Sequence, residues 1–394
     1  MNASSQRIYS LAFWLLCISS LLFSVSFSMM IPELPAYLTS MGGAEYKGLI
    51  IALFTLTAGI SRPFSGKLTD TIGRVPIMAF GSLVCFACGF LYPLLTTVAG
   101  FLLLRFVHGF STGFKPTGTS AYIADIIPEN RRGEALGLNG LIASIGMSAG
   151  PPLGSWLVEA FSLNTLFYVS SFIALGSIAI LMNLKETLTQ KQRFSPSLLL
   201  LSKDEIVEKD AFPPAIVYVL TCIAYGAVFA LAPDLSEYVG IHNKGLFFSA
   251  FTVSSLAIRF LAGKASDKWG RIPVIKISLL FYTASIVVIA FAHTPTMLLI
   301  GAGIFGIGLG MNSPAIFAWA IDVSQEHNRG KSLATVYIAL EAGIGIGAIF
   351  SAWLYDNNPQ NFTKTFLICA LFSVAGLVYL FFYSQKRVTS AQPN

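Results

Sequence analysis

The chain has 394 residues, of which 55% are hydrophobic and only 11% are charged, and its net charge is +6. A soluble domain usually carries about a quarter charged residues, so this composition excludes a water-soluble globular protein. Apolar runs of about twenty residues recur along the chain, and each can cross about 30 Å of hydrocarbon as a helix. We therefore expect an all-α membrane protein that has the lipid bilayer as its solvent.

Twelve apolar runs follow one another in chain order. The first six are expected at residues 9–31, 45–65, 74–93, 97–123, 134–160 and 163–184. The second six are expected at residues 213–236, 243–262, 272–291, 296–321, 330–355 and 362–384. A polar, lysine-bearing stretch separates the two groups. The sequence therefore predicts twelve transmembrane helices, with a first bundle over 1–184, a cytoplasmic loop over 185–212 and a second bundle with a short cytoplasmic tail over 213–394.

Lysine and arginine are unevenly shared between the predicted loops. With the N-terminus in the cytoplasm, 20 of the 25 basic residues lie on the cytoplasmic side, Lys47, Lys244 and Lys364 lie outside, and Arg105 and Lys115 lie within helices. This bias follows the positive-inside rule, so we expect both termini in the cytoplasm. The net positive charge then reflects topology and indicates no nucleic-acid partner. The compact loops suit a bacterial inner membrane.

No cofactor or catalytic site is expected from the sequence. The five cysteines all lie in apolar runs, and their odd number and isolation favour neither a disulfide framework nor a metal site. The string Gly301 to Gly306 fits the GxGxxG nucleotide fingerprint, but it lies within a predicted helix and lacks the preceding strand that such a site needs. We therefore expect no enzyme and no bound metal.

The chain contains an internal repeat. The segment from Gly66 to Arg74 reappears as Gly263 to Arg271, a shift of 197 residues, and the same shift relates Arg62 to Arg259. Because six helices separate the copies, both have the same orientation in the membrane and are related by an axis along its normal. The sequence predicts two parallel six-helix bundles with a site between them.

The repeated GxxxDxxGR loop lies between the predicted second and third helices and again between the eighth and ninth. In this placement the chain resembles the major facilitator superfamily over essentially its whole length. The resemblance implies a transporter that works as a monomer by alternating access, with a cytoplasmic latch that joins the bundles when the cavity faces outward. Ordinary solvated loops with topology-setting charge are the alternative. The latch residues implied are Gly66, Asp70, Gly73, Arg74, Asp125 and Arg132, with Gly263, Asp267, Gly270, Arg271, Asp322 and Arg329 as their copies.

The predicted fifth helix carries a second pattern, formed by Gly137, Gly146, Gly150, Pro151 and Gly154. Its spacing resembles the antiporter motif of the superfamily, although a serine follows the last glycine. Glycines at these spacings form a flat helix face, and a proline can bend the helix where it packs against the other half. The pattern favours export, with generic small-residue packing as the alternative.

Ionisable groups form a stripe in the predicted fourth helix. Arg105, His108, Thr112 and Lys115 are three or four residues apart and so share one face. A charged group near the centre of a membrane helix costs at least about 2.5 to 3.5 kcal/mol, so we expect this face to line a wet cavity. Arg105 resembles the exporter arginine linked to proton coupling or substrate binding. Hydrogen-bonded packing of His108 and snorkelling of Lys115 are the alternatives.

Glu341 is the acidic residue that stands out, because it lies about nine residues, or roughly 14 Å, into the predicted eleventh helix. Burial there favours the protonated carboxyl, which suits a group that carries a proton in a coupled cycle. The alternative is a static ion pair with Arg105 or Lys115.

From these features we expect a secondary active transporter that exports a small organic molecule in exchange for protons, with an anionic or amphipathic molecule favoured. Proton-coupled uptake of a metabolite and movement of a lipid or lysolipid are alternatives. A membrane receptor or scaffold without transport is the alternative from another class, but it could dispense with the paired latches and the polar cavity.

Overall fold

The computed structural model describes residues 9–128, 131–199, 207–325 and 329–390. For residues 260–264, 329–330 and 384–390 the description covers the backbone only. Within these ranges the chain is helical and contains no β-strand.

Six membrane-crossing segments form the first half of the chain. The first is α1 (Leu11–Ser28), which a 3-10 turn at Ile31–Glu33 joins to the short α2 (Leu34–Ser40). The other five are α3 (Lys47–Thr71), α4 (Arg74–Leu91), α5 (Val98–Ile126), α6 (Arg132–Ala160) and α7 (Leu163–Met182).

The second half also has six crossing helices, preceded by short 3-10 turns at Pro196–Leu199 and Lys209–Ala211. They are α8 (Phe212–Tyr238), α9 (Gly245–Trp269), α10 (Arg271–Ala290), α11 (Pro295–Val323), α12 (Arg329–Tyr355) and α13 (Phe362–Ser390). The predicted set of twelve helices is confirmed, while the domain boundaries at 184 and 212 stay a prediction.

Side-chain caps fix where several helices begin. The hydroxyl of Thr97 accepts from the backbone N–H of Gly100 at the start of α5, and the hydroxyl of Thr294 does the same for Met297 at the start of α11. Such a cap satisfies a donor that the first helical turn leaves without a partner. The matching caps on α5 and α11 preserve the internal repeat at the level of helix starts.

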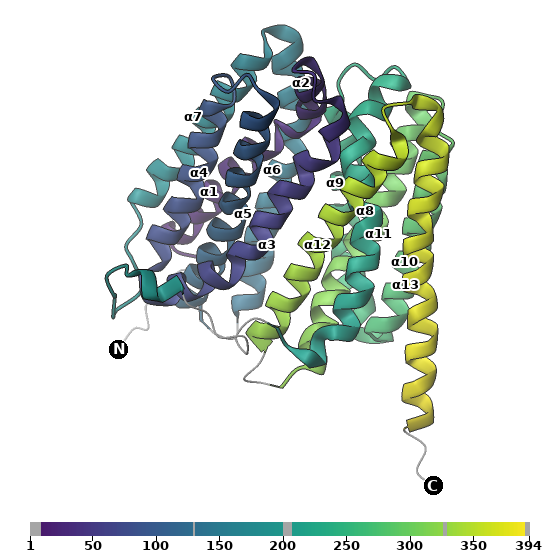
Figure 1. Cartoon of the computed structure of the whole chain (residues 1–394). Helices are drawn as coiled ribbons and strands as arrows, with labels where there is room; N and C mark the ends of the chain where they lie inside the picture. The colour runs from purple at the N-terminus through teal and green to yellow at the C-terminus, as the bar shows by residue number, and fades with distance from the viewer. Residues whose placement is uncertain (1–8, 129–130, 200–206, 326–328, 391–394) are drawn as a thin grey trace.

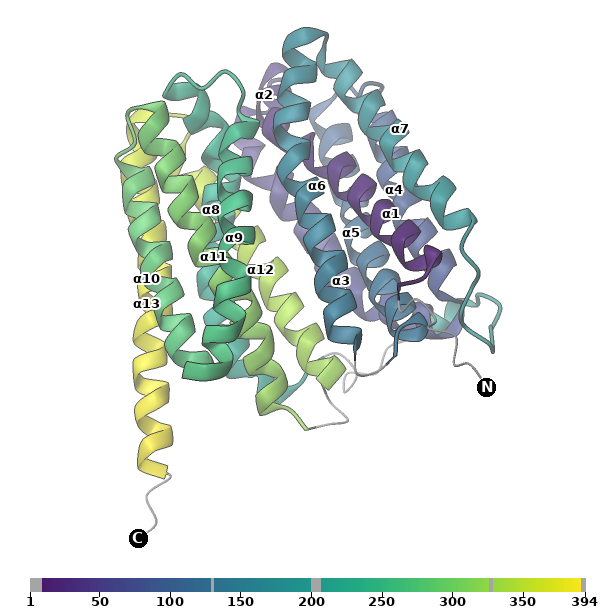
Figure 2. The ribbon, with the colours of Figure 1, turned by 180° about the vertical axis from the view of Figure 1, so that it is seen from behind.

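Ten of the described helical segments are long and apolar enough to cross a membrane by length and composition alone. The helix α5 is not one of them, since Arg105, His108 and Lys115 lower its hydropathy. Of α9, the stretch Gly245–Arg259 is apolar, and it ends where the side-chain description is interrupted at residue 260. Both helices nevertheless run alongside the others in Figures 1 and 2. The charges of α5 are therefore held inside the protein rather than in lipid.

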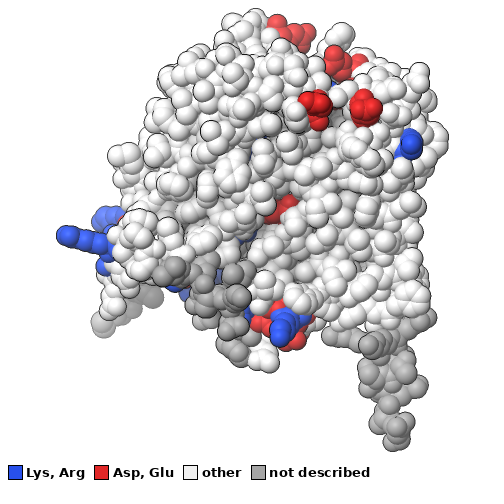
Figure 3. Space-filling view, viewed as in Figure 1, with Lys and Arg blue, Asp and Glu red and all other residues white. Residues whose placement is uncertain are grey.

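The helices form two bundles that stand side by side, α1–α7 in one and α8–α13 in the other (Figures 1 and 2). We call them the N-bundle and the C-bundle. Across the interface α3 packs on α12 and α6 packs on α9. The start of α1 and the end of α13 lie at the same end of the molecule in Figure 1, as an even number of crossings requires. Figure 3 shows Lys, Arg, Asp and Glu gathered near the two ends, with an almost uncharged band between them.

Candidate functional site

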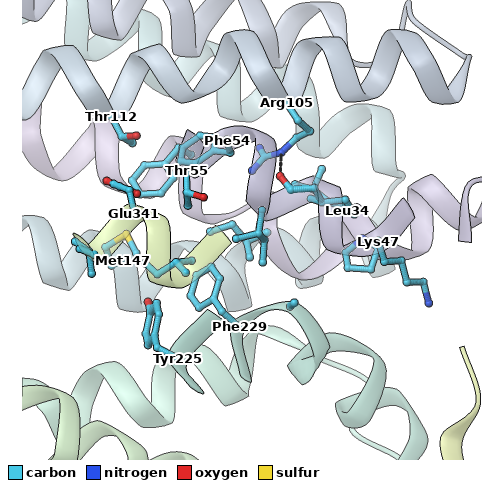
Figure 4. Close-up of a pocket in the computed structure, with 18 residues that line it drawn as sticks. Leu34, Lys47, Phe54, Thr55, Arg105, Thr112, Met147, Tyr225, Phe229 and Glu341 are labelled. Carbon is cyan, nitrogen blue, oxygen red and sulfur yellow. Dashed lines mark hydrogen bonds between the residues drawn. The ribbon is translucent and has the colours of Figure 1, made fainter. Parts of the chain in front are cut away.

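A cavity of about 260 Å³ lies between the bundles, and we call it the central cavity. Side chains from α1, α3, α5, α6, α8 and α12 line it (Figure 4). Most of the lining is apolar or aromatic, including Phe27, Phe54, Met147, Tyr225 and Phe229. A concave, largely apolar chamber with a few polar groups is the usual form of a small-molecule site.

Glu341 on α12 reaches across the interface to Arg62 on α3, with a carboxylate oxygen 3.0 Å from a guanidinium nitrogen. Glu341 is only 9% exposed. The same guanidinium lies 4.3 Å from the ring centroid of Tyr337. Gly59 permits the approach, because a Cβ on it would lie 3.2 Å from the Glu341 Cβ. An ion pair therefore joins the two bundles at the wall of the central cavity.

This partner differs from the two considered from sequence. The hypothesis that Glu341 pairs with Arg105 or Lys115 is wrong, because α12 packs on α3 and both of those residues belong to α5. Arg62 was visible in the sequence only through its repeat copy, Arg259. That duplicated arginine within an apolar run was the signal that could have found it.

Arg105 faces the central cavity and is 4% exposed. Its Nε donates to the backbone carbonyl of Ile50 at 2.8 Å, drawn as a dashed line in Figure 4, and another nitrogen lies 3.4 Å from the hydroxyl of Tyr92. The guanidinium is also 4.6 Å from the ring centroid of Phe54. None of the ion pairs between described residues includes Arg105. Its positive charge is therefore held by neutral groups and is available to an anionic ligand.

The other residues of the α5 stripe, His108, Thr112 and Lys115, lie in different environments. His108 is fully buried in the N-bundle, where its ring nitrogens lie 3.2 Å from the Tyr92 hydroxyl and 3.4 Å from the Cys85 sulfur. This arrangement is the hydrogen-bonded packing that was the alternative for His108 in the sequence analysis. Lys115 is 1% exposed and lines a second cavity, while Thr112 lines both cavities.

The bundles also meet at the end of the molecule opposite the start of α1 (Figure 1). Lys47 on α3 and Asp234 on α8 form an ion pair across the interface there, with 2.5 Å between nitrogen and oxygen. We call this pair the outer gate, because the sequence predicts that Lys47 lies outside the cell. Nearby, the amide of Asn243 donates to the carbonyl of Pro152 at 3.0 Å. The side chain of Asp234 is largely buried in this pair.

The N-bundle copy of the predicted latch is a local cluster. Gly73 ends the α3–α4 turn at φ +138°, a backbone conformation that side chains disfavour. Beyond it, the Arg74 guanidinium pairs with Asp70 and Asp125, each at 3.0 Å. Gly66 has open space where a Cβ would lie.

The C-bundle copy repeats this arrangement. Gly270 has φ +89°, and Arg271 pairs with Asp267 and, at 2.8 Å, with Asp322. For Gly263 and Arg329 the description covers the backbone only.

Each cluster stays within its own bundle. Among the described side chains, no ion pair links one latch copy to the other bundle. Arg132 has a buried Nε without a hydrogen-bond partner. The sequence expectation was a latch that forms when the cavity faces outward, and the structure instead has its outer gate formed. The latch role of these residues stays a prediction.

The glycines of α6 also divide between two environments. Gly146, Gly150 and Gly154 pack directly on the backbone of α1 within the N-bundle, so a side chain at any of them would collide with it. Pro151 makes the contact with the other bundle, where its backbone touches Gly245 at the start of α9. Gly137 has open space around it. The motif therefore holds α1 along one face and meets the C-bundle through Pro151.

Comparison with known proteins shows which family has this architecture. The family model of the Major Facilitator Superfamily matches residues 16–212 and 214–394. The multidrug resistance protein MdtG of Serratia proteamaculans is 27% identical, with 95% of this chain and 93% of that protein covered. The quinolone resistance protein NorA of Staphylococcus aureus is 24% identical, with 93% and 95% covered.

Solved structures agree on the fold. The human organic anion transporter MFSD10 superposes with a TM-score of 0.72 at 16% identity, covering 94% of this chain and 98% of that one. A mutant of the nucleoside transporter NupG has the same TM-score at 15% identity, covering 94% and 99%. With a family match over both bundles, this chain belongs to the Major Facilitator Superfamily and is an integral membrane transporter.

Proposed function

We propose that the chain is a secondary active exporter, which moves a small amphipathic organic molecule outward by alternating access in exchange for protons. The observation that carries this proposal is the Glu341–Arg62 ion pair, because it joins the two bundles at the wall of the central cavity. A single proton can therefore alter the contact between the parts that must move.

The proposed cycle follows from that geometry. Ionised Glu341 is held by Arg62 and keeps α12 against α3. Protonation removes the negative charge and most of the attraction, so the bundles are freer to rearrange. A membrane potential contributes about 2.3 kcal/mol per charge per 100 mV, which is comparable with a tenfold to hundredfold concentration step. One proton per cycle is enough to drive such accumulation.

The proposed substrate class rests on the lining of the central cavity. Phenylalanine, tyrosine and methionine side chains supply a broad apolar surface, and Arg105 supplies a cation without a carboxylate partner among the described residues. The full-length relatives named for multidrug and quinolone resistance support an organic substrate exported from the cell. We propose the inner membrane of a bacterium, cytoplasmic termini and a monomer as the setting.

A second candidate is uptake of an organic anion together with a proton. Arg105 and Glu341 line the same cavity. An anion bound to Arg105 would favour a neutral Glu341, so proton and substrate could bind together rather than in exchange. The direction of proton movement separates the two candidates.

The test uses purified protein in liposomes under an imposed pH gradient, with a panel of aromatic drugs and organic acids and a fluorescent record of internal pH. Export predicts proton movement opposite to substrate, and uptake predicts movement in the same direction. Glu341→Gln should abolish proton-driven accumulation. Glu237→Gln is the matched control, because Glu237 pairs with Lys244 within the C-bundle. Full proton-driven accumulation by Glu341→Gln would refute the coupling role.

A further inference from the structure

A second cavity of about 250 Å³ lies wholly within the N-bundle, and we call it the Lys115 pocket. Residues of α1, α3, α5 and α6 line it. Its polar lining includes Lys115, Arg62, Thr112, Asn139, Ser20 and Ser24. Since all of these residues belong to one bundle, the pocket can keep its shape while the bundles rock against each other.

Three residues that line this pocket each carry a buried polar atom that has no hydrogen-bond partner among the described residues. The three atoms are the Nζ of Lys115, the amide oxygen of Asn139 and the Nε of Arg62. Leaving such an atom unpaired costs about 1 to 3 kcal/mol, and more when it is charged. Lys115 is the extreme case, because its charged Nζ has no hydrogen-bond partner among the described residues and lies 5.2 Å from the centroid of the Phe23 ring. These groups can accept a partner that the described residues do not supply.

The polar groups of the lining indicate the chemical class of this ligand. A lysine ammonium and an arginine Nε are hydrogen-bond donors with positive charge, which pair most strongly with a carboxylate or similar oxyanion. The hydroxyls of Ser20 and Ser24 can donate further bonds, while the Asn139 amide oxygen requires a donor. A carboxylate with a neighbouring hydroxyl or amide N–H satisfies both requirements.

The pocket also adjoins the central cavity, since Phe27, Thr112 and Met147 line both. The two cavities differ in character, because the central one is mostly apolar. We infer that the Lys115 pocket binds the carboxylate of the transported molecule while its apolar body lies in the central cavity. This inference rests on the proposed function only in taking the ligand to be the transported molecule.

Arg62 connects this pocket with Glu341. One guanidinium nitrogen of Arg62 contacts Glu341, and the Arg62 side chain also lines the Lys115 pocket, where its Nε has no hydrogen-bond partner among the described residues. A bound carboxylate and Glu341 would therefore be neighbours on the same cation. The substrate headgroup is placed where the charge of Glu341 can influence it.

The experiment measures equilibrium binding, without any gradient, by calorimetry on the purified full chain in detergent. Three probes of similar size are compared, namely 2-naphthoate, 2-naphthylmethanol and 2-naphthylmethylamine. Wild type should prefer naphthoate to both others by at least about tenfold. Lys115→Met should weaken naphthoate binding by about tenfold or more and leave naphthylmethanol binding within about twofold, because one desolvated charge pair is lost. Lys191→Met, which removes an exposed lysine, is the control and should bind like wild type.

The experiment distinguishes a failure of this inference from misfolding of the variant and from a failure of the proposed function. If Lys115→Met is poorly folded by its melting temperature, Lys115→Gln tests the same pocket, because it keeps a polar side chain but removes the charge, and it should also weaken naphthoate binding selectively. The inference is overturned if wild type does not bind naphthoate or prefers the amine, or if the Lys115 variant binds naphthoate as wild type does. Because no proton flux is measured, such a failure leaves the proposed proton coupling to its own test.

Discussion

The outer gate offers the sharpest test of alternating access in this chain. Lys47 and Asp234 approach to 2.5 Å, and both side chains are mostly buried. At that distance and an effective dielectric constant of about 20, Coulomb attraction is roughly 6 to 7 kcal/mol, much of it offset by desolvation. We take a net contribution of about 2 kcal/mol, which corresponds to a change of roughly 30-fold in the ratio of closed to open gates.

Asp234→Asn should therefore increase the open population roughly 30-fold. The assay is the rate at which an impermeant thiol reagent, added from the gate side, labels Ala230→Cys, because Ala230 lines the central cavity and is buried. The native cysteines are all buried and should contribute little background. The exchanged pair Lys47→Asp with Asp234→Lys should restore slow labelling.

The matched control is Glu237→Gln. Glu237 and Lys244 form a 2.7 Å ion pair in the C-bundle, so its loss should leave the labelling rate unchanged. A double-mutant cycle between Lys47 and Asp234 with a coupling below about 0.5 kcal/mol would refute the reasoning. Equal acceleration by Glu237→Gln would show that labelling reports general loosening instead.

Two further predictions concern the motifs. Gly146→Val should lower the free energy of unfolding by about 1 to 3 kcal/mol, because its side chain would meet the α1 backbone. Gly137→Val should change the free energy of unfolding by no more than about 0.5 kcal/mol, because there is open space at that position. Equal melting temperatures for the two variants would contradict this prediction. Asp70→Asn should reduce transport several-fold while substrate binding and stability change little, since Asp70 is 71% exposed and such pairs contribute at most about 1 kcal/mol. Weakened binding with normal transport rates would argue against the latch.

The sequence predicted the helices and their symmetry well, because both depend on features that are local or repeated along the chain. The length of an apolar run decides whether it can cross the lipid. The copy of Gly66–Arg74 at Gly263–Arg271 shows that the two bundles have the same orientation in the membrane. The local latch clusters follow from the same spacing, since Asp70 and Arg74 are four residues apart, on either side of the α3–α4 turn.

The contacts between bundles could not be predicted in this way. Glu341 and Arg62 are 279 residues apart, and the faces that α12 and α3 turn to each other depend on packing that no short pattern records. The contact between Lys47 and Asp234 could not be predicted either, because these residues are 187 positions apart and each lies near the end of a predicted helix. The sequence located the ionisable residues but not their partners.

The internal repeat also shows where duplication and function diverged. The shift of 197 residues that carries Arg62 to Arg259 carries Ser144 to Glu341. Arg259 and Ser144 lie along one small cavity at the α6–α9 crossing. There the Ser144 hydroxyl donates to the carbonyl of Gly140, and the Nε of Arg259 has no hydrogen-bond partner among the described residues. Of these two crossings, which are equivalent in the repeat, the α3–α12 crossing alone pairs its arginine with an acid among the described residues. If the proposed coupling holds, protonation of Glu341 loosens the α3–α12 crossing and leaves the α6–α9 crossing unaffected, so a nearly symmetric scaffold responds asymmetrically to pH.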